Sequence, residues 1–202
     1  MPVTLWLLSY LVGSVSSAIL ICRLLGLPDP REEGSHNPGA TNVLRVGGKV
    51  AGALTLLGDV GKGVLPVYLS LMLHPSATVA ALCGVFAFIG HCYPVYFDFR
   101  GGKGVATAFG VLAMLHWPSA LFTGALWVSV FALTRVSSLA SLISWTLAPF
   151  ALYFFADTFM DPLLILIAIL IYRHYPNLFL LAKGKEHSFT EPSKNHPDSP
   201  ET

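Results

Sequence analysis

Residues 50–73 read VAGALTLLGDVGKGVLPVYLSLML, an apolar run interrupted by one acidic and one basic residue. A hydrocarbon core of about 30 Å is crossed by roughly 20 predominantly apolar residues in a helix. The run is therefore predicted to be a transmembrane helix. Asp59 and Lys62 lie three residues apart within it, where charge is costly. They are either part of a functional site or a structural pair whose charges neutralise each other.

The composition of the whole chain agrees with a membrane location. Of its 202 residues, 54% are apolar and 11% are charged, whereas about a quarter of the residues in soluble domains are charged. The net charge of +1 gives no indication of a nucleic-acid partner, and none is expected. Cys22, Cys83 and Cys92 lie in or beside apolar runs without CxxC spacing. They are interpreted as free packing residues, so neither a disulfide nor a metal site is predicted.

Six further apolar runs accompany residues 50–73, and together they predict an all-α integral membrane protein with about seven transmembrane helices. The N-terminal run has no basic segment before it and no cleavage site after it, so it is expected to stay in the mature protein. Residues 1–186 are predicted to form a single polytopic membrane domain, and residues 187–202 a disordered cytoplasmic tail. The six runs lie near 4–25, 77–97, 105–117, 119–134, 138–156 and 162–173.

The distribution of basic residues predicts the orientation, because Lys and Arg collect in short cytoplasmic loops. With the N-terminus outside and the C-terminus inside, seven spans place every Lys and Arg on the cytoplasmic side except Lys62. Treating 105–134 as one span would move Arg135 and the basic C-terminal segment outside. The prediction therefore places three glycine-rich or polar stretches on the cytoplasmic face: 34–45, 100–104 and 173–186.

The first stretch, residues 34–45, reads GSHNPGATNVLR. Its Asn-Pro-Gly sequence is a strong turn signal, and Thr41 or Asn42 could cap a short helix that carries Arg45. Exposed backbone N–H groups in such a turn, beside an arginine, suit an anionic oxygen. An ordinary cytoplasmic loop is the alternative, since loops contain the same residue types.

The second stretch lies in residues 99–107, FRGGKGVAT, and places Gly101, Gly102, Lys103 and Gly104 directly before an apolar helix. Glycines let a phosphate approach the main chain, and the helix N-terminus offers N–H groups and a partial positive charge. The stretch does not fit a Walker A motif, which disfavours nucleotide hydrolysis.

The third stretch, residues 172–186, reads YRHYPNLFLLAKGKE. His174 and Asn177 would share a face of a continuous helix, although Pro176 makes unbroken helix doubtful. His174 is interpreted as a general base, a phosphate donor or an interfacial side chain. Two further residues each have two interpretations. Ser138, near the start of the sixth run, either caps the helix or contacts substrate. His91 either packs in the core or supports the GGKG loop.

The three stretches, in this order between apolar helices, resemble the bacterial acyl-phosphate:glycerol-3-phosphate acyltransferases, the PlsY family. The resemblance runs from Ser9 to about Glu186. It implies transfer of a fatty acyl group from acyl phosphate to the sn-1 hydroxyl of glycerol 3-phosphate, giving lysophosphatidic acid and phosphate. It also implies the bacterial inner membrane, with the active site facing the cytoplasm. His36 departs from the pattern, because many family members carry glycine there.

The resemblance also implies roles for individual residues. It ties Ser35 and Arg45 to activity, the glycines and Lys103 to phosphate binding, and the third stretch to activity and structural integrity. The predicted catalytic residues are Ser35, His174 and Asn177, with Glu186, Asp59 and Lys62 as structural support. The residues predicted to bind substrate or phosphate are Arg45, Thr41, Asn42, Gly101, Gly102, Lys103, Gly104 and Ser138.

The residue types in the three stretches suit the chemistry of this reaction. Acyl phosphate has a good leaving group, so the enzyme needs positioning and charge neutralisation more than a covalent nucleophile. No cofactor is expected. Ser35 is accordingly assigned to substrate binding rather than to an acyl-enzyme. His174 is interpreted as a substrate-orienting donor, with an acyl-phosphate oxygen taking the proton, and a histidine base is the alternative. A transporter or channel for organic phosphates is the alternative function.

Overall fold

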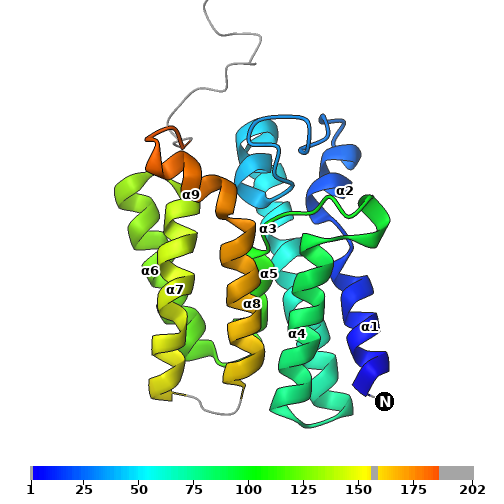
Figure 1. Ribbon diagram of the computed structural model, residues 1–202. Coiled ribbons are helices and arrows are strands. Elements are labelled where there is room, and N and C mark those ends of the chain that lie inside the picture. Colours follow the sequence, from blue (N-terminus) through cyan, green and yellow to red (C-terminus); the bar gives the residue numbers. More distant parts are fainter. Residues whose placement is uncertain (1, 156–158, 187–202) are drawn as a thin grey trace, which may run out of the picture.

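The computed structural model describes residues 2–155 and 159–186, and in these residues every regular element is a helix (Figure 1). Most of the longer helices run side by side along one axis, whereas α2 and α9 lie at one end of the bundle. The α-helices are α1 (Pro2–Gly13), α2 (Ser17–Leu24), α3 (Ala40–Leu73), α4 (Ala77–Cys92), α5 (Val105–Leu115), α6 (Trp117–Thr134), α7 (Ser137–Phe155), α8 (Met160–Arg173) and α9 (Tyr175–Ala182), and a 3-10 turn, η1, covers Val95–Phe97.

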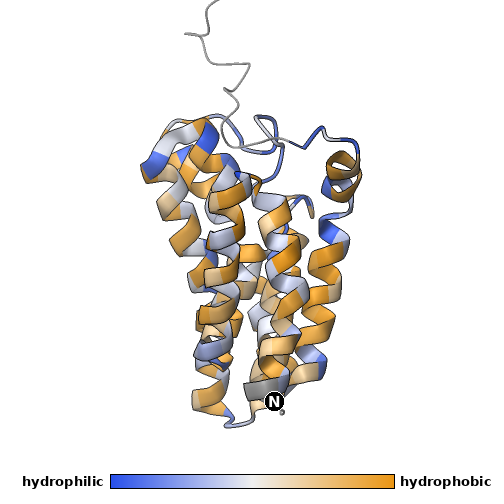
Figure 2. Cartoon of the chain, turned by 90° about the vertical axis from the view of Figure 1, so that its left-hand side faces the viewer, coloured by the Kyte–Doolittle hydropathy of each residue, from blue (hydrophilic) through white to orange (hydrophobic). Residues whose placement is uncertain are grey.

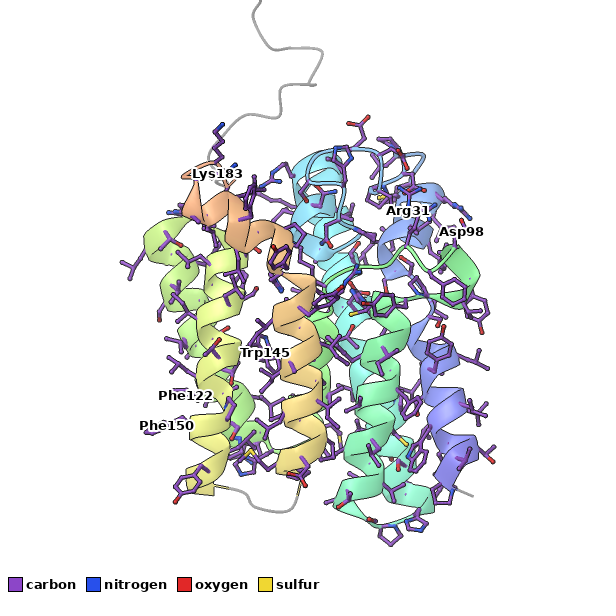
Figure 3. The ribbon with its side chains drawn as sticks, viewed as in Figure 1. Arg31, Asp98, Phe122, Trp145, Phe150 and Lys183 are labelled. Carbon is purple, nitrogen blue, oxygen red and sulfur yellow. The ribbon has the colours of Figure 1, made fainter. Side chains whose placement is uncertain are left out.

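The surface of the bundle is apolar along its length. Phe122 and Phe150 project outward with 42% and 62% of their surface exposed, whereas Trp145 is buried between helices (Figure 3). Hydrophobic residues cover the sides of the helices, and hydrophilic residues gather toward the ends (Figure 2). Exposed apolar side chains on long helices are expected where lipid, not water, is the surrounding solvent.

Four helical segments of the described residues are long and apolar enough to cross a membrane: 2–24, 40–73, 77–97 and 117–134. Counting the bent pair α8 and α9 as one segment makes five. The predicted number of about seven crossings stays a prediction, because α5 and α8 alone are shorter than the usual span. The three cysteines are buried and free, as predicted.

Two apolar runs differ from the helices that they form. The run near 4–25 divides into α1 and α2, because the Ser14 hydroxyl bonds back to the Tyr10 carbonyl and Ser16 caps α2 by accepting from the Ile19 N–H. Helix α3 begins at Ala40, ten residues before the predicted run, and is kinked at Gly48, where φ is 80°. This kink separates a short helix that carries Arg45 from the long span.

Small residues allow the helices to approach closely. A side chain at Gly63 of α3 would collide with the backbone of Thr107 in α5, and one at Gly110 of α5 would collide with the backbone of Val60 in α3. Close backbone approach through glycine is a usual way for helices to pack in lipid. The packing fixes the start of α5 relative to α3, and therefore the GGKG loop relative to the first stretch.

The three stretches singled out in the sequence lie at the same end of the bundle. Residue 2 lies at the opposite end, and the chain reaches residue 186 at the end where the stretches meet (Figure 1). The sequence prediction that the stretches share one face is therefore confirmed in the fold. The predicted disordered tail, 187–202, lies outside the described residues.

Candidate active site

The first stretch forms a turn followed by the short helix that carries Arg45. Gly39 is the N-cap of α3, and no side chain caps the helix there. The predicted cap by Thr41 or Asn42 is therefore wrong, because the turn at Asn37–Gly39 starts the helix one residue before Thr41. The Thr41 hydroxyl instead lies 3.3 Å from the Ser137 hydroxyl at the start of α7.

Asn42 holds the loop that precedes it. Its Oδ1 accepts from the Ser35 N–H at 2.8 Å, and its Nδ2 donates to the carbonyls of Pro30 and Glu33, both at 2.9 Å. The side chain is buried and its amide hydrogens and oxygen are used by the protein. Asn42 therefore supports the loop that precedes it.

The strained position in this loop is His36, whose φ is 56°. This is the left-handed region, which glycine adopts without steric cost. The conformation explains why glycine suits this position. The exposed His36 ring lies with Nδ1 3.3 Å from the Arg31 carbonyl.

The second stretch packs against the end of α4, and its glycines are required by that contact. A side chain at Gly101 would collide with the carbonyl of His91, and one at Gly102 with the imidazole of the same residue. The Gly102 N–H donates to the His91 carbonyl at 3.2 Å. A Cβ at Gly102 would also lie 3.1 Å from the Pro38 carbonyl, so the first and second stretches are in contact.

Helix α5 starts without a side-chain cap. Its N-cap is Gly104, which has a φ of 81° and leaves no room for a side chain beside the Phe88 ring. The N–H groups in the first turn of a helix have no partner within the helix. An uncapped N-terminus beside Lys103 is a suitable site for a phosphate.

Lys103 interacts with three other charged side chains at this end of the bundle. Burial lowers the pKa of Lys103 to about 8; Glu186 opposes this shift, and Arg173 and Arg45 add to it. These groups come from four places in the chain: the loop before α5, the end of α8, the start of α3 and the segment after α9. Three cations and one carboxylate leave a net positive charge for an anionic ligand.

The third stretch bends by 51° between α8 and α9, at His174. Pro176 lies in the first turn of α9, where proline is tolerated, so the doubt about an unbroken helix is justified. His174 is 2% exposed, and its Nδ1 lies 2.8 Å from the Leu170 carbonyl. Because a carbonyl only accepts, Nδ1 carries the hydrogen, and the neutral ring has its lone pair on Nε2. Lys103 is close enough to His174 to interact electrostatically.

Glu186 connects two helices around this site. Its Oε1 accepts from Asn177 Nδ2 in α9 at 2.6 Å and from the Ser138 hydroxyl in α7 at 2.8 Å. Its Oε2 is buried without a hydrogen-bond partner among the described residues. The contacts join α7 to α9 through Glu186, and they give Ser138 and Asn177 a protein partner.

Asp59 and Lys62 form a buried ion pair of 2.9 Å beneath the loops. Lys62 Nζ also donates to the Val15 carbonyl at the break between α1 and α2, at 2.8 Å. Asp59 Oδ1 lies 3.6 Å from His91 Nδ1. Because His91 also contacts the GGKG loop, the ion pair is linked to that loop through His91.

The prediction missed two arginines. Arg31 forms a salt bridge with Asp29 and donates to the Phe97 carbonyl. The second contact ties the loop before α3 to the segment between α4 and α5. Arg173 donates to the carbonyls of Gly101 and Gly102. The position of Arg173 beside His174 was the only available sequence signal, because both contacts depend on residues far away along the chain.

The comparisons with known proteins agree on one family. Residues 3–184 match the family described as glycerol-3-phosphate acyltransferase. The glycerol-3-phosphate acyltransferase of Idiomarina loihiensis is 49% identical over 181 residues, covering 90% of this chain and 92% of the relative. That of Methylococcus capsulatus is 50% identical over 191 residues, covering 92% and 96%.

Two solved structures have the same fold. Both are crystal structures of PlsY, an integral membrane glycerol 3-phosphate acyltransferase. The glycerol 3-phosphate form has a TM-score of 0.87 at 36% identity, and the lysophosphatidic acid form has a TM-score of 0.86 at 34% identity. Each comparison covers 93% of this chain and 94% of the other.

Proposed function

The chain belongs to the glycerol-3-phosphate acyltransferase family, and from this premise we propose that it acylates the sn-1 hydroxyl of glycerol 3-phosphate with acyl phosphate. The products are lysophosphatidic acid and inorganic phosphate, and the reaction is the first step of phospholipid synthesis. The observation that carries the proposal is the meeting of Arg45, Lys103, the uncapped start of α5 and His174 at one end of an apolar bundle.

Charge neutralisation is the first task of this site. The two substrates each carry a phosphate, so they repel each other as they approach. Arg45 and Lys103 offset this repulsion, and charge-assisted hydrogen bonds contribute roughly 1.5–3 kcal/mol each. The apolar sides of the helices suit the acyl chain, which stays in the bilayer while its phosphate reaches the polar end.

The acyl transfer itself is a direct displacement. The hydroxyl oxygen attacks the carbonyl carbon, the bond between that carbon and the phosphate oxygen breaks, and phosphate leaves with the bonding electrons. Ser35 is exposed, and within the described residues its hydroxyl has no histidine or carboxylate partner to activate it. Its proposed role is therefore substrate binding and not formation of an acyl-enzyme.

The attacking hydroxyl loses its proton to one of two acceptors. In the neutral tautomer fixed by Leu170, His174 Nε2 can accept a hydrogen bond from the hydroxyl, and it donates only when the ring is protonated. An oxygen of the departing phosphate is the second acceptor. This tautomer replaces the donor role that the sequence suggested for His174, because a neutral Nε2 accepts. The hydroxyl has one proton: if it points to Nε2, His174 is the base, and if it points to the phosphate, a phosphate oxygen is the base.

The proposed location is the bacterial inner membrane, with the active site facing the cytoplasm. The excess of Lys and Arg at the end that carries the three stretches supports this orientation. We propose that residues 1–186 form one polytopic membrane domain with about seven crossings, the N-terminus outside. Residues 2 and 186 lie at opposite ends of the bundle (Figure 1), and a chain whose ends lie on opposite sides of a membrane crosses it an odd number of times.

The test uses purified full-length protein in detergent with acyl phosphate and labelled glycerol 3-phosphate. We expect an organic-soluble labelled product together with an equal amount of inorganic phosphate. The matched control is Lys103→Ala, which should lose the product, beside Arg100→Gln in the same loop, which should keep it. A protein that makes no product in detergent, but moves labelled phosphate ester across closed vesicles, would be a transporter.

A further inference from the structure

Arg173 holds the GGKG loop by its carbonyl oxygens. Its Nη2 donates to the Gly101 carbonyl at 2.8 Å, and its Nε donates to the Gly102 carbonyl at 3.2 Å. The guanidinium also lies over the Tyr93 ring, 5.0 Å from its centre. These contacts join the end of α8 to a loop about 70 residues earlier, and the flat guanidinium is fixed in one orientation.

The two carbonyl contacts determine where the loop N–H groups point. The peptide unit between Gly101 and Gly102 is held at both ends, because its carbonyl bonds Arg173 and its N–H bonds the His91 carbonyl. In the next unit, the Gly102 carbonyl is held by Arg173. Since the C=O and N–H of a trans peptide point in opposite directions, the Lys103 N–H points away from Arg173.

The direction of these peptide units depends on contacts from outside the loop, because three of its four residues are glycines without side chains. Gly101, Gly102 and Gly104 have little intrinsic conformational preference, and the start of α5 has no side-chain cap. Without Arg173 the peptide unit that carries the Lys103 N–H would be free to rotate. A carbonyl oxygen could then face the phosphate, which would repel it.

We propose that Arg173 is a positioning residue of this acyltransferase, which turns the carbonyls of Gly101 and Gly102 away from the phosphate and directs the Lys103 N–H toward it, beside the α5 N-terminus. The proposal rests on the proposed function for the identity of the phosphate ligand. It assigns Arg173 to the protein side of the loop, with Arg45 and Lys103 left to contact the substrates.

A second property of Arg173 makes this role measurable. Four groups face Lys103: the carboxylate of Glu186, the guanidinium groups of Arg173 and Arg45, and the imidazole of His174. Arg173 is one of the cations that lower the pKa of Lys103, which burial brings to about 8. Removing the charge at residue 173 therefore raises the pKa of Lys103 and moves its loss of charge to higher pH.

The experiment compares Arg173→Gln and Arg173→Lys with wild type, and uses Arg100→Gln as the matched control. Arg100 lies in the same loop, but its exposed side chain pairs with Glu32. Steady-state kcat/KM is measured against pH for each substrate. The stabilisation of each protein by inorganic phosphate is measured separately by thermal unfolding.

We expect Arg173→Gln to lower kcat/KM by about ten- to a hundredfold and to move the alkaline limb of the profile to higher pH. Arg173→Lys keeps the charge but loses the fork, so it should lower kcat/KM by at least about tenfold with the alkaline limb unmoved. Both variants should show a smaller stabilisation by phosphate than wild type, and Arg100→Gln should match wild type throughout.

Near-normal kcat/KM in either variant would overturn the proposal, as would a loss in Arg173→Gln with an unmoved alkaline limb. If Arg173→Gln does not fold, the kinetics of Arg173→Lys decide alone. A wild type that makes no lysophosphatidic acid would reject the proposed function, and the phosphate-dependent thermal shift would still test the role of Arg173.

Discussion

Arg45 and Lys103 carry the same charge on side chains of different shape, and we expect them to hold phosphate by different means. The planar fork of Arg45 can bind two oxygens, whereas Lys103 is a compact charge in a loop that supplies directed N–H donors. Arg45→Lys should keep the charge but lose the two-oxygen geometry, and Lys103→Arg should keep the charge but crowd the glycine loop that admits the phosphate. Both should lower kcat/KM by about tenfold or more, and the alanine variants should be worse.

The measurement is steady-state kinetics with glycerol 3-phosphate and acyl phosphate varied in turn. Each variant should change the KM of one substrate more than that of the other. Arg100→Gln controls for loss of a loop cation. Near-normal kinetics in both alanine variants would remove the phosphate-binding role from this loop and from α3.

His174 offers a direct test of which group takes the proton. The ring is fixed by the Leu170 carbonyl and interacts with Lys103. His174→Gln and His174→Asn keep a side chain that can accept a hydrogen bond but cannot act as an imidazole base. If the phosphate oxygen is the base, at least one of these variants should keep substantial kcat. A near-complete loss of kcat with unchanged KM in both variants would identify His174 as the base.

At the scale of the helices, the Asp59–Lys62 ion pair connects α3 to the break between α1 and α2. Lys62 neutralises Asp59 and bonds the Val15 carbonyl exposed by the break between α1 and α2. We expect Lys62→Met to destabilise the protein by about 3–5 kcal/mol, because it leaves a buried carboxylate unpaired. Adding Asp59→Asn should recover part of that loss, since the unpaired charge is then gone.

Thermal unfolding in detergent measures both effects, and loss of the exposed pair of Arg100 and Glu32 is the matched comparison. That pair is worth little, because surface ion pairs contribute about 0–1 kcal/mol. Equal stability of Lys62→Met and wild type would show that the buried pair does not stabilise the bundle. A stable but inactive Lys62→Met would instead give the pair a role in function.

At the scale of the whole molecule, the orientation in the membrane is the property to test. Lys185 lies at the end that carries the three stretches, and Pro75 lies between α3 and α4 at the opposite end. In intact cells, an impermeant thiol reagent should label Pro75→Cys and spare Lys185→Cys, and permeabilised cells should show both. The native cysteines are buried, so their background is low. Labelling of Lys185→Cys in intact cells contradicts the orientation.

The sequence determined the class of the fold and the gathering of the three stretches at one end, because these depend on local properties. Hydropathy over about 20 residues predicts where helices cross, and the charge pattern gathers the three stretches at one end. The residue types of the second stretch predicted a phosphate loop at the start of a helix, and the glycines do lie at the N-terminus of α5. The order of the three stretches was specific enough to indicate the family.

Only the tertiary structure decided which polar side chains face the ligand and which hold the protein together. Asn42 was predicted to bind substrate or phosphate, and the structure shows that its amide group holds the loop through Ser35, Pro30 and Glu33. Glu186 joins α7 to α9, and Arg173 holds glycines about 70 residues away. Such contacts depend on the direction of each side chain and on how distant helices pack. Neither is encoded in spacing along the chain, so the residue types were predictable and their partners were not.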